Sequence, residues 1–290
     1  MPWDKIHNHY LYLQSLILFL KCHEYVLNLN GMLIASRMKL MNEHKKGFKK
    51  VKKEYAYILI AYILMQLSSF IGVPLVYRIG LWAGKDPYTM RQVTPGYWIV
   101  ISFSITLVIV LLILRKAGFD DSFVRKKTAS AGESILWAIA GIFLALFAQG
   151  IAGSIELKLF GVDPGSKNTE TILHIIKTFP VAMLVSSIIG PILEEIVFRK
   201  IIFGALYKRF SFWIAATVSS VIFALAHMEF EHILLYSAMG FTFAFLYVRT
   251  GRILVPIFAH VAMNTLVVVT QLFKHDQLQQ IQGLIGGFIQ

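Results

Sequence analysis

The sequence predicts an all-α membrane protein, a polytopic bundle of about 7–8 transmembrane helices around a membrane-embedded polar cavity. Of its 290 residues, 57% are hydrophobic and only 15% are charged, whereas soluble domains carry roughly a quarter charged residues. Several apolar runs reach the length of about 20 residues that a bilayer-spanning helix needs. No segment shows the alternating strands of about 10 residues that indicate a membrane barrel.

Successive apolar runs, bounded by charged residues or by glycine and proline, mark the expected helices. The fourth run contains Pro191. It either breaks there, with proline in the first turn of a new helix segment, or continues as one long tilted helix to residue 207. The expected spans are residues 55–77, 97–114, 134–154, 171–193, 212–228, 232–248 and 253–272.

Lysine and arginine residues gather in every second loop, which sets the expected orientation. The formal net charge is +12, and in a membrane protein such an excess reflects cytoplasmic loops more often than nucleic-acid binding. We therefore expect a multi-pass protein of a bacterial plasma membrane, with its basic N-terminal segment in the cytoplasm and no nucleic-acid partner. The basic residues on this side are Lys45, Lys46, Lys49, Lys50, Lys52 and Lys53, then Arg115, Lys116, Arg125, Lys126 and Lys127, then Arg199, Lys200, Lys208 and Arg209, then Arg249 and Arg252.

Polar residues inside the apolar runs are the candidate functional residues, because an ionisable side chain in a span costs about 2.5–3.5 kcal/mol on insertion scales. Three pairs share a spacing of four residues, which places both members on one face of a helix. Each pair can therefore point toward one common cavity. The pairs are Glu195 with Arg199, Phe223 with His227, and His260 with Asn264.

Glu194 and Glu195 are adjacent, so on a helix they point about 100° apart and are expected to have different roles. Glu195 faces Arg199 in the order that favours an ion pair. Glu194 has no local cation and suits the role of a general base. The alternative is that both acids and Arg199 only mark the cytoplasmic end of a span.

Two histidines and an asparagine follow in later spans. His227 alone more often represents an interfacial or hydrogen-bonded histidine than a catalytic one. His260 and Asn264 lie well inside an apolar helix. They either hold helices together by hydrogen bonds or provide two neutral donors for an oxyanion hole.

In this order, the residues resemble the CAAX protease and bacteriocin-processing family, also called Abi, which includes the type II CAAX prenyl endopeptidases. The family motifs are two glutamates followed after three residues by arginine, phenylalanine followed after three by histidine, and histidine followed after three by asparagine. Every motif position is matched, by Glu194, Glu195 and Arg199, by Phe223 and His227, and by His260 and Asn264. The resemblance covers residues 134–272.

The resemblance implies an intramembrane endopeptidase that hydrolyses a membrane-associated peptide or protein. Glu194 would activate the attacking water with help from His227. His260 and Asn264 would stabilise the oxyanion, while Glu195, Arg199 and Phe223 would orient the site. It also divides the chain into an N-terminal extension with a basic segment (1–54), N-terminal helices and loops (55–133), a catalytic domain (134–272) and a short tail (273–290).

The sequence leaves open whether the reaction uses a metal ion. Family members are often named metalloproteases, and a metal-free, glutamate-dependent mechanism is the rival. The sequence has no His-Glu-x-x-His zinc motif, so we assign no metal and no required cofactor. If zinc is used, its ligands would be Glu194, His227 and His260, which are suitable types.

Two other functions compete with proteolysis. A non-catalytic membrane scaffold or bacteriocin self-immunity protein could use the same fold, although a scaffold need not keep every polar motif residue. A proton-coupled transporter could use buried acids and histidines as a relay, but the sequence shows no inverted repeat.

The expected spans place two of the candidate site residues at different depths in the membrane. Taken literally, they place Glu194 near the cytoplasmic end of one helix and His227 near the outer end of the next, roughly 20–25 Å apart along the membrane normal. We therefore expect one boundary to be wrong, and Glu194, His227, His260 and Asn264 to line one cavity.

Overall fold

The computed structural model describes residues 53–118, 124, 127–163 and 165–288, with side chains described up to Phe273. The expected basic N-terminal segment before Lys53, and the loop residues Arg125 and Lys126, lie outside this part. Within it the chain is helical and contains no strand. The predicted all-α bundle is therefore confirmed for the described residues.

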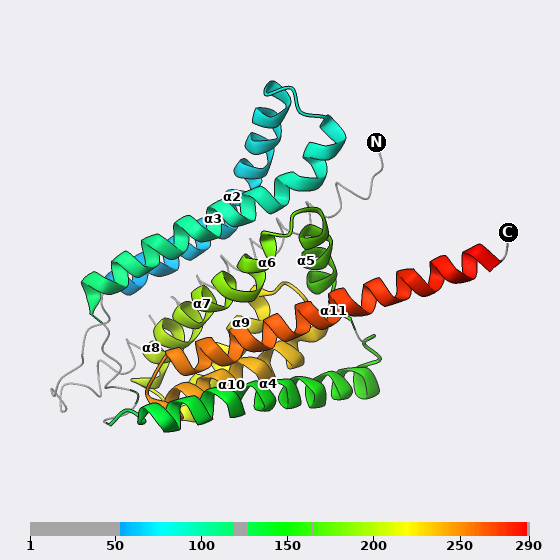
Figure 1. Ribbon diagram of the computed structural model, residues 1–290. Helices are drawn as coiled ribbons and strands as arrows, with labels where there is room; N and C mark the ends of the chain where they lie inside the picture. Colours follow the sequence, from blue (N-terminus) through cyan, green and yellow to red (C-terminus); the bar gives the residue numbers. More distant parts are fainter. Residues whose placement is uncertain (1–52, 119–123, 125–126, 164, 289–290) are drawn as a thin grey trace, which may run out of the picture. The chain divides into compact units, whose positions relative to one another are not determined.

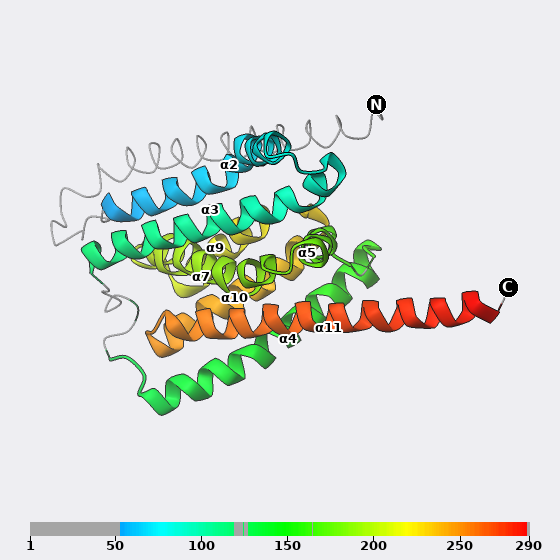
Figure 2. The ribbon, with the colours of Figure 1, turned by 45° about the horizontal axis from the view of Figure 1, so that its top comes forward.

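Within the described residues, five helices are long and apolar enough to cross a membrane, so the protein is a multi-pass membrane protein. Three of them are α2 (Lys53–Trp82), α3 (Pro87–Ala117) and α4 (Ala131–Phe160). The other two spans are Phe230–Thr250 and Leu254–Phe273. Figures 1 and 2 show α2 and α3 lying side by side.

Local sequence signals set the ends of the first helices. Asp86 begins α3 by accepting the backbone N–H of Thr89 at 2.7 Å, with Pro87 in the first turn. Ser130 and Glu133 form a capping box at the start of α4, which satisfies N–H groups that have no partner within the helix. Gly161, with φ +66°, ends α4 in the left-handed conformation that glycine adopts without strain.

The fourth expected span is split, and the break lies earlier than Pro191. The amphipathic α5 (Lys167–Thr178) has 12 residues, about 18 Å of helix, which is too short to cross the bilayer. Pro180 explains its end, because proline disfavours helical geometry in the residue before it. Phe179 accordingly leaves the helix with φ −143° and ψ 83°.

The backbone is helical again from Ala182 to Tyr207, as α6 (Ala182–Leu184), η1 (Val185–Ile189), α7 (Gly190–Glu194), η2 (Glu195–Phe203) and α8 (Gly204–Tyr207). The junctions between these segments keep right-handed helical angles. Of the two alternatives at Pro191, the break is therefore wrong and the helix that continues to residue 207 is found. The wider π-helical turns of η1 precede Pro191, and such turns accommodate a residue that cannot donate a backbone hydrogen bond. Glu194 lies near the middle of this helical run.

The next helix corrects the depth of His227. α9 (Phe212–Ala226) has 15 residues, about 22 Å, whereas the apolar core of a bilayer is about 30 Å thick. It therefore ends within the bundle and not at the outer surface. The chain turns back through η3 (Phe230–His232) into α10 (Ile233–Thr250). The short α9 removes the expected separation in depth between Glu194 and His227.

The last helix is longer than expected. α11 (Leu254–Phe288) continues past residue 272, where the sequence predicts the end of the span and a short tail. The helices α4, α10 and α11 pack against one another, and α9 packs on α10 (Figures 1 and 2). Small residues allow the close contacts. A Cβ on Gly240 would lie 3.0 Å from Ser220 Cβ, so these helices approach as closely as glycine permits.

One end of the bundle is tied together by the loops that carry basic residues. Arg252 donates from Nε to the carbonyl of Ala129 at 2.8 Å, and the N–H of Ala129 donates to the carbonyl of Thr250 at 2.8 Å. The start of α4 and the turn between α10 and α11 therefore lie at the same end.

Candidate active site

The centre of the site is a buried ion pair on η2. Arg199 Nε lies 3.2 Å from Glu195 Oε2, and both side chains are fully buried. The spacing of four residues predicted this pair. The Arg199 guanidinium also lies over the rings of Phe223, at 4.4 Å, and Phe243. Phe223 of the second motif thus contacts the cation of the first motif, where a cation–π interaction is strengthened by the absence of water.

His260 on α11 lies between the two glutamates. Its Nδ1 is 2.9 Å from Glu195 Oε1, and its Nε2 is 3.8 Å from Glu194 Oε2. The ring stacks on Phe243 with centroids 4.6 Å apart. Because an ionised carboxylate only accepts hydrogen bonds, Glu195 fixes the proton on Nδ1. The Nε2 atom that faces Glu194 can then donate only when the ring is protonated.

In His227 as well, Nδ1 is held by a hydrogen bond and Nε2 is the free nitrogen. Its Nδ1 lies 2.8 Å from the carbonyl oxygen of Phe223, and a carbonyl can only accept, so Nδ1 carries the proton. Nε2 is left with a lone pair that can accept from a water molecule. His227 follows the last residue of α9, and the next residue, Met228, has a positive φ of 60°. Such strained conformations in non-glycine residues often occur at functional sites.

Asn264 lies one turn after His260 on α11. Its Nδ2 donates to the carbonyl of Ser186 at 3.4 Å, which is a long hydrogen bond. Ser186 belongs to the π-helical segment η1. The amide is therefore held only weakly and can turn toward another acceptor.

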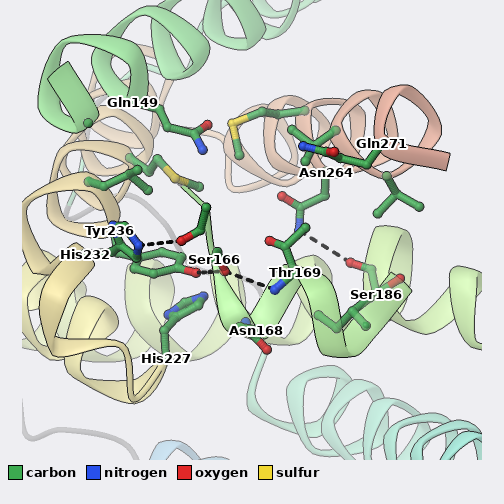
Figure 3. A pocket seen from close by; sticks show the side chains of 18 of the residues that line it. Gln149, Ser166, Asn168, Thr169, Ser186, His227, His232, Tyr236, Asn264 and Gln271 are labelled. Carbon is green, nitrogen blue, oxygen red and sulfur yellow. Dashed lines mark hydrogen bonds between the residues drawn. The ribbon is translucent and has the colours of Figure 1, made fainter. Parts of the chain in front are cut away.

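A cavity of about 320 Å³ adjoins these residues. His227, His260 and Asn264 line it, as expected, but Glu194 is not among its lining residues. The Glu194 side chain is 20% exposed and lies next to His260 Nε2. Its charge acts on His227 as well. Figure 3 shows His227 on one side of the cavity and Asn264 on the facing helix.

The outer part of the cavity holds a polar network that the sequence motifs did not indicate. His232 Nε2 donates to the carbonyl of Gly165 at 2.8 Å, and its Nδ1 lies 3.0 Å from Glu156 Oε2. Glu156 Oε1 also accepts the backbone N–H of Leu235 at 2.9 Å. The sequence signal for this pair was weak, because Glu156 and His232 each lie at the end of an apolar run and resemble ordinary interfacial residues.

Glu229 is a second carboxylate in this network. It accepts the N–H of Asn168 at 2.7 Å, and the hydroxyls of Ser166 and Tyr236 at 2.8 and 2.7 Å. Partial burial raises the pKa of Glu229, but these hydrogen bonds outweigh burial and leave the pKa below its ordinary value. Glu229 thus joins the start of α5 to the turn between α9 and α10.

The three residues that would be ligands if zinc is used, Glu194, His227 and His260, are not gathered as a metal centre. Among the described residues, no group of three or more His, Cys, Asp or Glu side chains is placed to hold a metal ion. Glu194 and His260 are neighbours, and His227 belongs to the same region without completing such a group.

A helical membrane bundle with carboxylate, imidazole and amide groups around an internal cavity has the groups that hydrolysis within a membrane requires. The comparisons with known proteins give the family. Residues 176–266 match the family model of the type II CAAX prenyl endopeptidase Rce1-like proteins. This region contains every motif residue named above.

Two curated relatives extend the match. The relative named "Putative membrane peptidase YdiL", from Bacillus subtilis (strain 168), is 52% identical over 243 residues, which is 82% of this chain and 99% of YdiL. The membrane-embedded CAAX protease MroQ of Staphylococcus aureus (strain USA300) is 41% identical over 152 residues, 50% of this chain and 62% of MroQ. No solved structure matches the chain significantly. The chain belongs to the Rce1-like family, a family of intramembrane proteases, as its motifs indicated.

The buried ion pair generates the first prediction. Arg199→Met should lower the free energy of unfolding by about 3–5 kcal/mol, because it leaves Glu195 charged and buried without its cation. The double variant Glu195→Gln/Arg199→Met should recover most of that loss, since neutral glutamine keeps an acceptor for His260 Nδ1. Thermal unfolding in detergent measures both. A double variant as unstable as Arg199→Met would show that the charge of Glu195 is not what Arg199 balances.

Proposed function

We propose that the protein is an intramembrane endopeptidase that hydrolyses a peptide bond of a membrane-associated peptide with water activated at Glu194. The observation that carries this proposal is the position of His260 between two carboxylates. Glu195 holds one ring nitrogen, and Glu194 lies beside the other. Glu195 is neutralised by Arg199, so Glu194 is the carboxylate left to take a proton.

The reaction needs a base, a path for the proton and donors for the oxyanion. Glu194 takes a proton from water as the water oxygen attacks the substrate carbonyl carbon, and the Nε2 lone pair of His227 orients that water. The carbonyl oxygen becomes an oxyanion. Breaking the C–N bond then returns the proton to the leaving amine, and the new acid end of the peptide keeps the water oxygen.

The oxyanion donors are Asn264 and His260. The amide of Asn264 exchanges its long bond to Ser186 for the stronger bond to an anion. His260 would donate from Nε2 as an imidazolium, the form in which Nε2 carries a hydrogen while Nδ1 donates to Glu195. The neutral donor inferred from the sequence is thus replaced by an imidazolium in this proposal.

The substrate is proposed to be a peptide or protein held at the bilayer. The cavity joins apolar side chains such as Met239 and Val267 to polar ones such as Gln149 and Gln271, which suits a chain that leaves the lipid for a polar site. The names of the family and of MroQ point to CAAX-type substrates, so a prenylated CAAX peptide belongs among the first substrates to test. The proposed mechanism needs no metal or other cofactor.

The proposed location is a bacterial plasma membrane with the basic loops in the cytoplasm. Arg115, Lys116 and Arg249 lie in the last turns of α3 and α10, the helix ends that the positive-inside rule places there. The cavity is lined by residues at the opposite helix ends, Asp163, Ser166 and Thr169 among them. The site therefore opens toward the outer leaflet in this orientation.

Replacement of the base tests the proposed function directly. Glu194→Gln should abolish cleavage of a panel of membrane-anchored peptides, one of them a prenylated CAAX peptide, because it removes the proton acceptor and keeps the shape. Glu231→Gln is the matched control, since Glu231 pairs with Lys167 on the exposed surface. Purified proteins would be assayed with and without a chelator. Full activity of Glu194→Gln would refute the role of Glu194, and loss of wild-type cleavage with chelator, restored by zinc, would refute the metal-free form.

Loss of one oxyanion donor has a characteristic kinetic result. Asn264→Ala should lower kcat by about 10²–10³-fold with little change in KM, because the donor acts mainly on the transition state. Thr265→Ala is the control, since the Thr265 hydroxyl donates to the carbonyl of Val261 in its own helix. A rise in KM with unchanged kcat would instead make Asn264 a binding residue.

The orientation can be measured by labelling single cysteines. In a Cys22→Ser background, Asp163→Cys should react with a membrane-impermeant maleimide in intact cells, because residue 163 is exposed beside the cavity. Lys116→Cys, exposed at the basic end, should react only after permeabilisation. The reverse pattern would place the cavity on the cytoplasmic side.

A further inference from the structure

Two aromatic rings contact the His227 ring in addition to its hydrogen bond. Phe223, one turn earlier on α9, meets the ring edge to face with centroids 4.5 Å apart. Tyr236, from α10, stacks on it with centroids 4.1 Å apart and an interplanar angle of 24°. The Phe223 contacts come from the same helix as His227, whereas Tyr236 ties the ring to a second helix.

Tyr236 is itself fixed in place. Its side chain is buried, and its hydroxyl donates to Glu229 Oε2 at 2.7 Å. Glu229 in turn accepts from Ser166 and from the N–H of Asn168. Figure 3 shows Tyr236, Ser166 and His227 close together on the same side of the cavity. The stacking ring is thus anchored through a carboxylate that three donors hold.

His227 needs this outside support because of its place in the chain. It follows the last residue of α9, where the helical hydrogen-bond ladder stops. Met228 then turns the backbone with a positive φ of 60°, a conformation that is strained for a residue with a side chain. This turn brings Glu229 to the hydroxyl of Tyr236 on the next helix, so the strained residue links the histidine to its anchor.

We propose that Tyr236 is a positioning residue for His227 and that Glu229 sets the place of Tyr236. This inference rests on the proposed function, in which His227 Nε2 orients the attacking water. Tyr236 holds the imidazole plane by stacking, while the Phe223 carbonyl holds Nδ1. Together these two contacts fix the direction in which the Nε2 lone pair of His227 points. Misplacement of a reacting group by about 1 Å can lower the rate by about 10²-fold. Loss of the fixed ring plane should therefore give a measurable fall in rate.

Four variants separate positioning from general stability. Tyr236→Leu removes the stack, Tyr236→Phe keeps the ring without its anchor, and Glu229→Gln removes the charge that holds the hydroxyl. Tyr207→Leu is the matched control, because Tyr207 stacks on Phe203 with centroids 5.2 Å apart and lies outside the site. Each would be assayed for kcat and KM on the best-cleaved peptide of the panel.

Tyr236→Leu should lower kcat by about 10–100-fold while KM changes less than about threefold. Tyr236→Phe should keep most of the wild-type kcat. The kcat of Glu229→Gln should lie between those of Tyr236→Leu and Tyr236→Phe. Tyr207→Leu should keep the wild-type kcat per folded molecule. Equal kcat in Tyr236→Leu and wild type would overturn the proposal, as would equal losses in Tyr236→Leu and Tyr207→Leu.

A second readout is independent of any substrate. In protein with ¹⁵N-labelled histidine, the His227 ring, identified by loss of its signals in His227→Gln, should show a proton on Nδ1. Tyr236→Leu should shift these signals and mix the two tautomers. An unchanged His227 spectrum in Tyr236→Leu would refute positioning even if the rate fell. If wild-type protein cleaved no peptide, the proposed function would fail, while this spectrum would still decide the role of Tyr236.

Discussion

One buried carboxylate, Glu195, organises the centre of this membrane protein. One of its oxygens faces Arg199 and the other faces His260, so three motif residues from two helices meet at a single group. Removing these charges from water costs several kcal/mol per ion. Among the described residues, the terminal nitrogens of Arg199 have no hydrogen-bond partner, and the faces of Phe223 and Phe243 surround that guanidinium instead. The pair therefore sets where η2, α9, α10 and α11 must meet.

This arrangement also explains why the chain carries two adjacent glutamates. They do not share a role, but they address the two nitrogens of one imidazole, Glu195 at Nδ1 and Glu194 near Nε2. The π-helical turns on either side of α7 change the angular step between residues from that of a regular helix. Glu195 is fully buried, while the Glu194 side chain is 20% exposed and lies beside His260 Nε2. Two consecutive residues therefore have separate roles: Glu195 supports the site, and Glu194 is the proposed base.

The sequence predicted the helical membrane fold, the Glu195–Arg199 pair and the family, because these depend on hydrophobic length and on spacing within one helix. It failed where the outcome depends on contacts between helices. The continuation of the helix past Pro191, which the sequence left open against a break, and the end of α9 within the bundle at His227 follow from local widening of the helix and from packing, which leave no periodic signal. The break before Pro180 did have a local sequence signal, which the expected span 171–193 did not use. Glu156, Glu229, His232 and Tyr236 were missed for a related reason. Each lies near a predicted boundary, where polar residues are common. Only the fold brings Glu156, His232 and Tyr236 to one cavity and joins Glu229 to Tyr236.

In the proposed mechanism, a water molecule attacks the substrate carbonyl carbon. A carboxylate of the protein does not. Single-turnover cleavage in H₂¹⁸O, with enzyme in excess over a membrane-anchored peptide, tests this directly. The proposed mechanism requires ¹⁸O in the new carboxyl end of the product and none in Glu194 when the protein is digested and its peptides are weighed. Appearance of ¹⁸O in Glu194 would show that this side chain forms a covalent bond with the substrate, which would contradict its assignment as a base.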